Sequence, residues 1–191
     1  MLGARIALLV CFAVFFVCHA DGQANPCEQV NIISRAEWEA REPKDIEILP
    51  GPVMYSFIHH TAMEQCFTQS DCSEMVRSIQ NYHMDSNGWS DIGYSFLIGE
   101  DGNVYEGRGW DRVGAHTKGY NDVGLAFSIM GDFTKILPKQ NALDLAQNMI
   151  ACGLHLGKIE SDYTLRGHRD MGSTACPGDD LYAEIKTWPH Y

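Results

Sequence analysis

The cysteines limit most strongly how this chain can fold. There are seven of them in 191 residues. Five remain once the apolar N-terminal stretch is set aside, and they are Cys27, Cys66, Cys72, Cys152 and Cys176. Because five is an odd number, at most four can pair within the chain and one thiol is left over. Disulfide bonds persist in oxidising compartments, so the pattern matters only if the protein is exported.

The N-terminal stretch has the layout of a secretory signal peptide. Arg5 supplies a positive charge, residues 6–17 form an unbroken apolar run, and the small residue Ala20 follows. The run is short for a membrane span, although an N-terminal anchor helix is the alternative. We expect a signal peptide over residues 1–20, with residue 24 as the alternative end, and one domain over residues 27–191. The mature protein would then be secreted and extracellular, with no insertion into a membrane.

Two disulfide pairings are favoured by position, although four cysteines allow three connectivities. Cys66 and Cys72 flank a short polar loop and can bridge locally. Cys27 lies near the mature N-terminus, and a bridge to Cys152 would tie this end to a helix-like stretch. Cys176 would then be left over, either as a buried or dimer-forming thiol or as a functional group.

The net charge excludes some classes of partner. The formal charge is −11, and the expected leader contains only one charged residue, Arg5. Binding to nucleic acid requires clustered Lys and Arg, which an acidic chain of this kind does not favour. The same argument applies to adhesion to anionic membranes. An anionic ligand would have to be held by a few well-placed residues.

Strand and helix patterns alternate along the chain. The expected strands span residues 53–58, 94–98, 103–105 and 125–130, and the expected helices start near Ser73, Pro138 and Pro177. The Asp-Gly pair between the second and third strands predicts a hairpin. These patterns predict a single α/β domain in which a central mixed sheet is flanked by about three helices.

Histidine and cysteine positions allow a zinc site. His59 ends an expected strand, and His168 and Cys176 are eight residues apart across a loop that contains Gly and Ser. Zinc binds imidazole and thiolate groups, and a catalytic site keeps a fourth position open. His60 would point to the opposite strand face from His59. Because no His-Glu-x-x-His or Cys-x-x-Cys motif is present, spacing alone leaves structural histidines as the simpler interpretation.

Seven segments, in order, resemble the peptidoglycan recognition proteins, which share their fold with phage-type N-acetylmuramoyl-L-alanine amidases. These segments are residues 33–38, 59–62, 78–85, 91–102, 104–110, 167–170 and 181–190. The resemblance covers nearly the whole chain after the expected leader. It implies the α/β fold of that family, with a binding groove that contains zinc.

The resemblance also implies residue roles. His59, His168 and Cys176 match the Zn²⁺ ligands of the amidase-type members, whereas receptors of the family often have Ser at the third position. Tyr94 and Thr174 match catalytic residues near the scissile carbonyl. Bound zinc would polarise that carbonyl and lower the pKa of water, which suits hydrolysis of the lactyl amide between N-acetylmuramic acid and L-alanine. This set contains no Glu base, so proton transfer falls to Tyr94, a histidine or water.

Three further positions concern substrate preference. Gly88, Trp89 and Arg108 resemble the set that prefers meso-diaminopimelic acid to L-lysine in the peptide stem. A guanidinium can bind the additional carboxylate of diaminopimelic acid with paired charge-assisted hydrogen bonds. The alternative for Arg108 is an internal ion pair with Glu106 or Asp111. The resemblance also implies contacts to the muramyl peptide from Thr61, His83, His116 and Asn121.

The function that we expect from the sequence is that of a secreted, zinc-dependent peptidoglycan amidase in innate immune defence. It would bind muramyl peptides and prefer the diaminopimelic type of peptidoglycan. The alternative is a non-catalytic peptidoglycan-binding receptor, or a bactericidal or agglutinating protein. Cys176 separates these hypotheses, because zinc hydrolysis requires this residue and binding alone does not.

Overall fold

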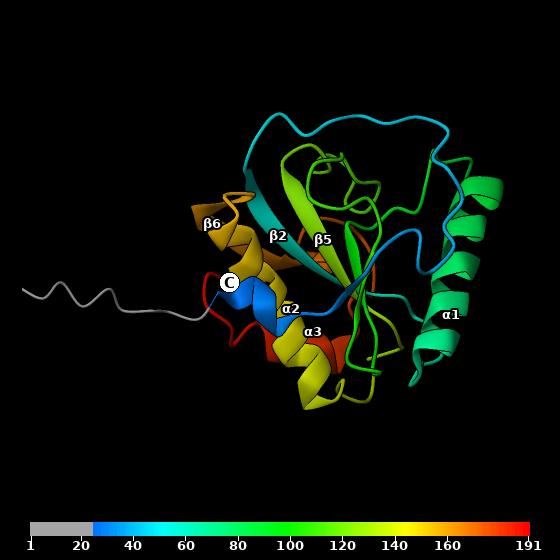
Figure 1. Cartoon of the computed structure of the whole chain (residues 1–191). Helices are drawn as coiled ribbons and strands as arrows, with labels where there is room; N and C mark the ends of the chain where they lie inside the picture. The colour runs from blue at the N-terminus through cyan, green and yellow to red at the C-terminus, as the bar shows by residue number, and fades with distance from the viewer. Residues whose placement is uncertain (1–24) are drawn as a thin grey trace, which may run out of the picture.

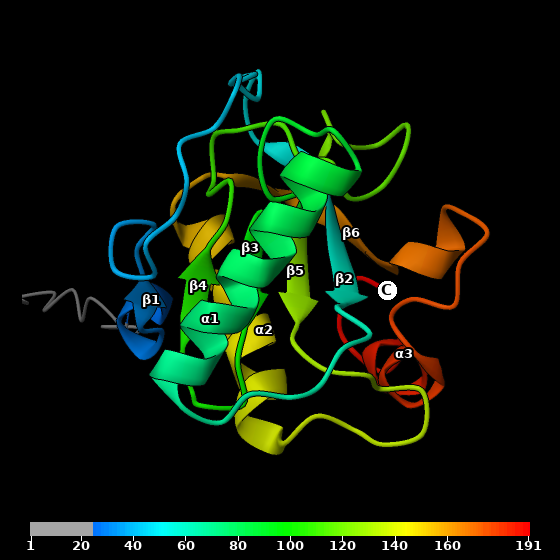
Figure 2. The same ribbon diagram turned by 90° about the vertical axis from the view of Figure 1, so that its right-hand side faces the viewer.

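The computed structural model describes residues 25–191, in which a six-stranded sheet is covered by helices on both faces (Figures 1 and 2). The expected signal peptide falls on residues 1–24, outside the described part of the chain. The prediction of an α/β fold with a central mixed sheet and three flanking helices is confirmed. No helix within residues 25–191 combines the length and apolar character needed to cross a membrane.

The strands and helices are joined by connections of unequal length, the long ones covering residues 34–52 and 107–123. The strands are β1 (Ile32–Ile33), β2 (Val53–His60), β3 (Phe96–Ile98), β4 (Val104–Glu106), β5 (Gly124–Ile129) and β6 (Ile159–Gly167). The α-helices are α1 (Gln69–Asn81), α2 (Gln140–His155) and α3 (Asp179–Ile185). Short helical turns are η1 (Pro26–Gln29), η2 (Tyr82–Ser86) and η3 (His168–Asp170).

The sheet order is β1-β4-β3-β5-β2-β6, and its centre is parallel. Strand β2 pairs in parallel with both β5 and β6, and β3 pairs in parallel with β5. Strands β3 and β4 are antiparallel, as the hairpin prediction required. Because parallel strands end at the same edge of a sheet, the C-terminal ends of β2 and β6 lie together. This edge carries His59 and, directly after β6, His168.

The two sheet faces have separate cores. Helices α2 and α3 pack on one face with Ile58, and α1 packs on the other face (Figure 1). Since successive side chains of a strand alternate between faces, His59 points to the α1 face and His60 to the α2 and α3 face. The backbone N–H of Phe133 donates to Nδ1 of His60 there. Figure 2 views the α1 face, with the orange segment after β6 and the red α3 beside β2.

Residues 25–191 contain two disulfide bonds, one long-range and one local. Cys27 in η1 is joined to Cys152 in α2 with a Cα–Cα distance of 4.7 Å, and Cys66 is joined to Cys72 in α1 with a distance of 5.1 Å. The first bond spans 125 residues and fixes the beginning of the described chain to α2. Cys176 is the free cysteine of residues 25–191.

Three details differ from the sequence expectations. Helix α1 starts one turn before Ser73, because the hydroxyl of Thr68 caps it by accepting from the backbone N–H of Asp71. Strand β6 was not predicted, and its exposed residues obscure its periodicity. Helix α3 starts at Asp179 rather than at Pro177 and ends at Ile185, and Trp188 packs against the core from the segment after it.

Candidate metal and ligand-binding site

A cluster of three ligating side chains forms at the end of β2. His59 comes from β2, His168 opens η3 directly after β6, and Cys176 lies in the loop before α3. One ligand atom from each residue lies within 4.8 Å of the other two. The distance between Sγ of Cys176 and Nδ1 of His59 is 3.6 Å, and the centroids of the two imidazole rings are 4.5 Å apart. The structure therefore brings together the three predicted zinc ligands.

The spacing of these atoms suits a tetrahedral zinc ion. Zinc forms bonds of about 2.0–2.3 Å to nitrogen and sulfur, which places neighbouring ligand atoms about 3.3–3.8 Å apart. Burial lowers the pKa of His59 and that of His168, so both rings are neutral near pH 7 and offer a lone pair. Three protein ligands leave one coordination position open.

The thiol of Cys176 needs a cation to ionise. Burial raises its pKa to about 12, although the backbone N–H of His60, 3.4 Å from Sγ, and the nearby charge of Arg169 favour the thiolate. A divalent cation displaces the thiol proton, because metal binding and deprotonation are coupled. The donor set and its protonation therefore fit zinc, with Cys176 as a thiolate in the bound state.

The loop that carries Cys176 is held by Arg169, which sequence reasoning missed. The Arg169 side chain pairs with Asp179 at 2.7 Å and donates to the carbonyl oxygens of Ala175 and Cys176. Its backbone N–H also donates to the Cys176 carbonyl at 3.0 Å. The Gly-His-Arg-Asp motif contained the signal, because this arginine directly follows a candidate ligand.

The two predicted catalytic residues contact different members of the cluster. The Tyr94 ring centroid is 5.4 Å from that of His59. Burial raises the pKa of Tyr94 well above its usual value, and the charge of Cys176 acts in the same direction, so the hydroxyl keeps its proton. Thr174 is exposed, and its hydroxyl accepts from the backbone N–H of Cys176 at 3.2 Å.

Two pockets adjoin the cluster. The first has a volume of about 410 Å³, and Tyr94 contributes to its wall. Its other lining residues are Thr61, Met63, Ser78, Ile79, Tyr82 and His83. The second has a volume of about 390 Å³ and reaches His168. Its other lining residues are Trp89, Ala115, His116, Lys118 and Asn121. Five predicted ligand-binding residues therefore line the two pockets, whereas Gly88, with a φ of 73°, and Arg108 line neither.

The histidines of the pocket walls are held neutral. Burial, together with the positive charge of Arg108, lowers the pKa of His83 to about 4. Burial similarly lowers the pKa of His116 to about 3. Nδ1 of His83 accepts from the backbone N–H of Gly93 at 3.0 Å, which fixes its ring.

Thr117 is a buried residue that sequence reasoning missed. Its hydroxyl lies 3.3 Å from Nε2 of His59 and 3.0 Å from Nδ1 of His116. The side-chain oxygen of Asn121 accepts from the backbone N–H groups of His116 and Thr117 and so holds this loop. The only signal in the sequence is that Thr117 directly follows a candidate groove histidine.

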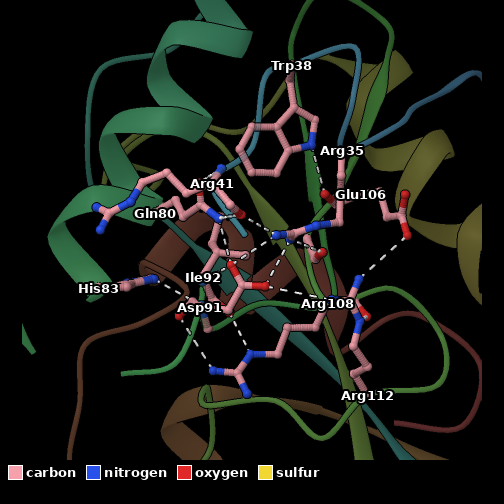
Figure 3. A network of polar contacts seen from close by, with 12 residues as sticks. Arg35, Trp38, Arg41, Gln80, His83, Asp91, Ile92, Glu106, Arg108 and Arg112 are labelled. Carbon is pink, nitrogen blue, oxygen red and sulfur yellow. Dashed lines mark hydrogen bonds and ion pairs between the residues drawn. The ribbon is translucent and has the colours of Figure 1, made fainter. Parts of the chain in front are cut away.

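The side chain of Arg108 is buried and bonded to backbone oxygens (Figure 3). Its Nε donates to the Ile92 carbonyl and its Nη1 to the Val113 carbonyl, both at 2.7 Å. Within the described residues it forms no ion pair with Glu106 or Asp111, which was the alternative considered for it. Those two carboxylates pair instead with other side chains, namely Arg112 and Lys158.

Asp91 organises the surroundings of Arg108 and was also missed from the sequence. Its Oδ1 accepts from the Gln80 amide at 2.7 Å and from the backbone N–H of Ile92 at 2.8 Å. Its Oδ2 is 3.0 Å from Nη1 of Arg35 and 3.8 Å from Nη1 of Arg112. As Figure 3 shows, this buried carboxylate is the centre of the network, and it fixes the segment whose carbonyls bind Arg108.

Comparison with known proteins agrees with this architecture. Residues 49–179 match the N-acetylmuramoyl-L-alanine amidase family. The chain is 45% identical to peptidoglycan-recognition protein LB of Drosophila melanogaster over 161 residues, which are 84% of this chain and 69% of that protein. It is 43% identical to peptidoglycan recognition protein 1 of Bos indicus over 171 residues, which are 89% of each chain.

The fold agrees with solved structures of these relatives. Drosophila PGRP-LB superposes with a TM-score of 0.83 at 44% identity, covering 85% of this chain and 96% of the other. Peptidoglycan recognition protein LE, in complex with tracheal cytotoxin, also gives a TM-score of 0.83 at 46% identity, covering 84% and 95%. From the family match and these identities, the chain belongs to the peptidoglycan recognition proteins, within the N-acetylmuramoyl-L-alanine amidase family.

Proposed function

We propose that this protein is a secreted, zinc-dependent amidase that cleaves the lactyl amide between N-acetylmuramic acid and L-alanine in innate immune defence. The observation that carries the proposal is the convergence of His59, at the end of β2, with His168 and Cys176, which follow β6 about a hundred residues later. Binding of a glycopeptide alone does not require a partly buried thiol beside two neutral imidazoles. Such a cluster is what a hydrolytic zinc site with an open position requires.

The ligand that we propose is a muramyl peptide of bacterial peptidoglycan. The solved relative LE binds tracheal cytotoxin, described as a monomeric diaminopimelic acid-type peptidoglycan, and a human relative binds a glycosamyl muramyl pentapeptide. In the present chain, the two pockets adjoin the metal cluster through Tyr94 and His168. A glycopeptide that occupies both pockets would place its central amide near the cluster.

The protein residues have separate roles in this reaction. Zinc, when bound, supplies a Lewis acid for the carbonyl and lowers the pKa of water. The Tyr94 hydroxyl remains protonated, so it can donate a hydrogen bond to the oxygen of the scissile amide, where negative charge develops. Thr174 is exposed beside Cys176 and can orient the same group. The neutral His83 and His116 form polar pocket walls that do not repel a cation.

The charge of Arg108 supports a preference for the diaminopimelic type of peptidoglycan. Its bonds go to backbone oxygens, and no carboxylate lies within ion-pair distance of it in the described chain. The charges of Asp91 and Glu47 act on this guanidinium without forming an ion pair with it, so a direct carboxylate partner can still be supplied by a ligand. The additional carboxylate of diaminopimelic acid is such a group, whereas the side chain of L-lysine is a cation.

The test is the release of stem peptides from diaminopimelic-type peptidoglycan. The parent protein should release free peptides with an N-terminal L-alanine, and a chelator should stop the release. Cys176→Ser should lower the rate more than about 100-fold, because it removes a metal ligand, while peptidoglycan binding persists. A matched control is Cys66→Ser with Cys72→Ser, which removes a disulfide away from the cluster. If the parent protein binds the polymer without release, the amidase proposal is wrong and the receptor function replaces it.

A further inference from the structure

We infer that Thr117 is a positioning residue that fixes the hydrogen of the His59 ring on Nε2, so that Nδ1 is free to bind the metal. The inference rests on the zinc site proposed above. It concerns a residue that touches neither the ion nor the substrate. Its role would be to select the tautomer of a ligand.

The geometry around His59 defines two different ring nitrogens. Nδ1 faces Sγ of Cys176 at 3.6 Å and belongs to the ligand cluster. Nε2 faces the hydroxyl of Thr117 at 3.3 Å. His59 and Thr117 are each only 1% exposed, so water does not replace this hydroxyl as a partner. The hydrogen-bond partner of Nε2 therefore determines the tautomer.

The hydroxyl also contacts His116, and the direction of both contacts follows from the requirement that Nδ1 of His59 keep a lone pair for the metal. A nitrogen that binds a metal needs a lone pair, so the single ring hydrogen of neutral His59 must lie on Nε2 and point at Thr117. The Thr117 hydroxyl accepts this hydrogen bond and donates its own hydrogen to Nδ1 of His116, 3.0 Å away. In the opposite direction, the hydrogen of His59 would lie on Nδ1 and block the metal.

The loop holds Thr117 in place independently of the ion. The side-chain oxygen of Asn121 accepts from the backbone N–H of Thr117 at 2.8 Å, and the Thr117 carbonyl accepts from the backbone N–H of Tyr120 at 2.9 Å. Such preorganised partners of the second nitrogen are typical of metal-binding histidines. Here the partner is a hydroxyl rather than a carboxylate, so the site gains no further negative charge.

The first experiment measures zinc affinity by competition with a chromophoric chelator. Thr117→Val keeps the shape of the side chain and removes the hydroxyl, and we expect zinc binding about 10–100-fold weaker. Thr117→Ser restores the hydroxyl and should stay within about threefold of the parent, by the same argument. Thr164→Val, on the β6 strand, is the matched control and should not change affinity. Equal affinities for the parent protein and Thr117→Val would overturn the inference.

The second experiment reads the tautomer directly in metal-free protein, by long-range proton–nitrogen-15 correlation of the imidazole rings. The parent should show His59 with its hydrogen on Nε2, and Thr117→Val should show a mixture of tautomers. An unchanged spectrum in a folded Thr117→Val protein would contradict the role of Thr117. This readout separates the two proposals, because a parent that binds no zinc disproves the metal site while the tautomer still tests Thr117.

Discussion

The candidate metal site of His59, His168 and Cys176, called the metal cluster below, and the Arg108–Asp91 network are both largely shielded polar regions, but their hydrogen bonding differs. In the metal cluster, Nδ1 of His59 and Sγ of Cys176 face each other with lone pairs available. In the network, Asp91 and Arg108 are bonded to backbone and side-chain partners on several sides. The lone pairs of the cluster are left available for a ligand, whereas most polar atoms of the network have hydrogen-bond partners, and Oδ2 of Asp91 has ion-pair contacts only. Substitutions should therefore affect activity in the first region and stability in the second.

The largest effect should be the loss of stability caused by Asp91→Asn. This change removes the charge that faces Arg35 and Arg112 in a buried setting, and breaking such a pair typically costs about 3–5 kcal/mol. Urea unfolding at pH 7 measures the loss. Asp85→Asn is the control, because Asp85 forms an exposed pair with Arg41 and should change little. If both variants unfold alike, the network does not have the structural role that separates it from the metal cluster.

The second-largest effect should be a loss of activity with little change in the free energy of unfolding. His168→Ala removes a proposed metal ligand that is only partly buried, so the proposed hydrolysis should fall more than about 100-fold. The free energy of unfolding of the metal-free protein should change by less than about 1 kcal/mol, because no ion pair is broken. Peptide release and urea unfolding, measured on the same preparation, test the two statements together. A large loss of stability would remove the distinction between the regions.

A third prediction tests whether Arg108 takes part in substrate recognition in addition to its structural role. Arg108→Lys keeps the charge but cannot reproduce the paired geometry, so the rate ratio of diaminopimelic-type to lysine-type peptidoglycan should fall at least about tenfold. Arg112→Lys, which alters the neighbouring guanidinium, should leave the ratio near that of the parent. Peptide release from the two polymers gives the ratio. Equal ratios for Arg108→Lys and the parent would assign Arg108 to the scaffold alone.

The smallest effect is the dependence of stability on pH. The pKa of His83 is lowered to about 4 by burial, so between its unfolded value near 6.5 and pH 4 the unfolded chain binds one more proton than the native protein. Stability therefore falls as the pH drops through this window, by up to about 1.4 kcal/mol per unit for this group. His83→Gln should reduce the slope between pH 6 and pH 5 in urea unfolding. An unchanged slope would mean that His83 is not held neutral.

The sequence predicted those elements whose periodicity is strong. Short-range apolar patterns are sufficient to predict the hairpin of β3 and β4, the long helix α2 and the buried strands β2 and β5. Strand β6 was missed because its residues 160–162 are exposed, and only its second half alternates. The N-terminus of α1 was misplaced because Thr68 and Ser73 are both acceptable caps, and only tertiary packing selects between them.

The site was predictable only as far as residue types could be matched to a family. His59, His168 and Cys176 have no diagnostic spacing, since the chain separates the first from the last by 117 residues. Thr117 and Asp91 were missed for a different reason. Their importance lies in partners that are distant in sequence, such as His59 for Thr117 and Arg35 for Asp91. No local pattern encodes such contacts.

The parallel pairing of β6 beside β2 also has a consequence for biosynthesis. His59 is synthesised before the other two residues of the cluster. The cluster stays incomplete until the segment that contains His168 and Cys176 has left the ribosome. Since β6 is an edge strand, the rest of the sheet can assemble first and receive it last. The cluster can therefore form only after residue 176 has been synthesised, and a chain that stops before this point lacks the complete set of candidate ligands.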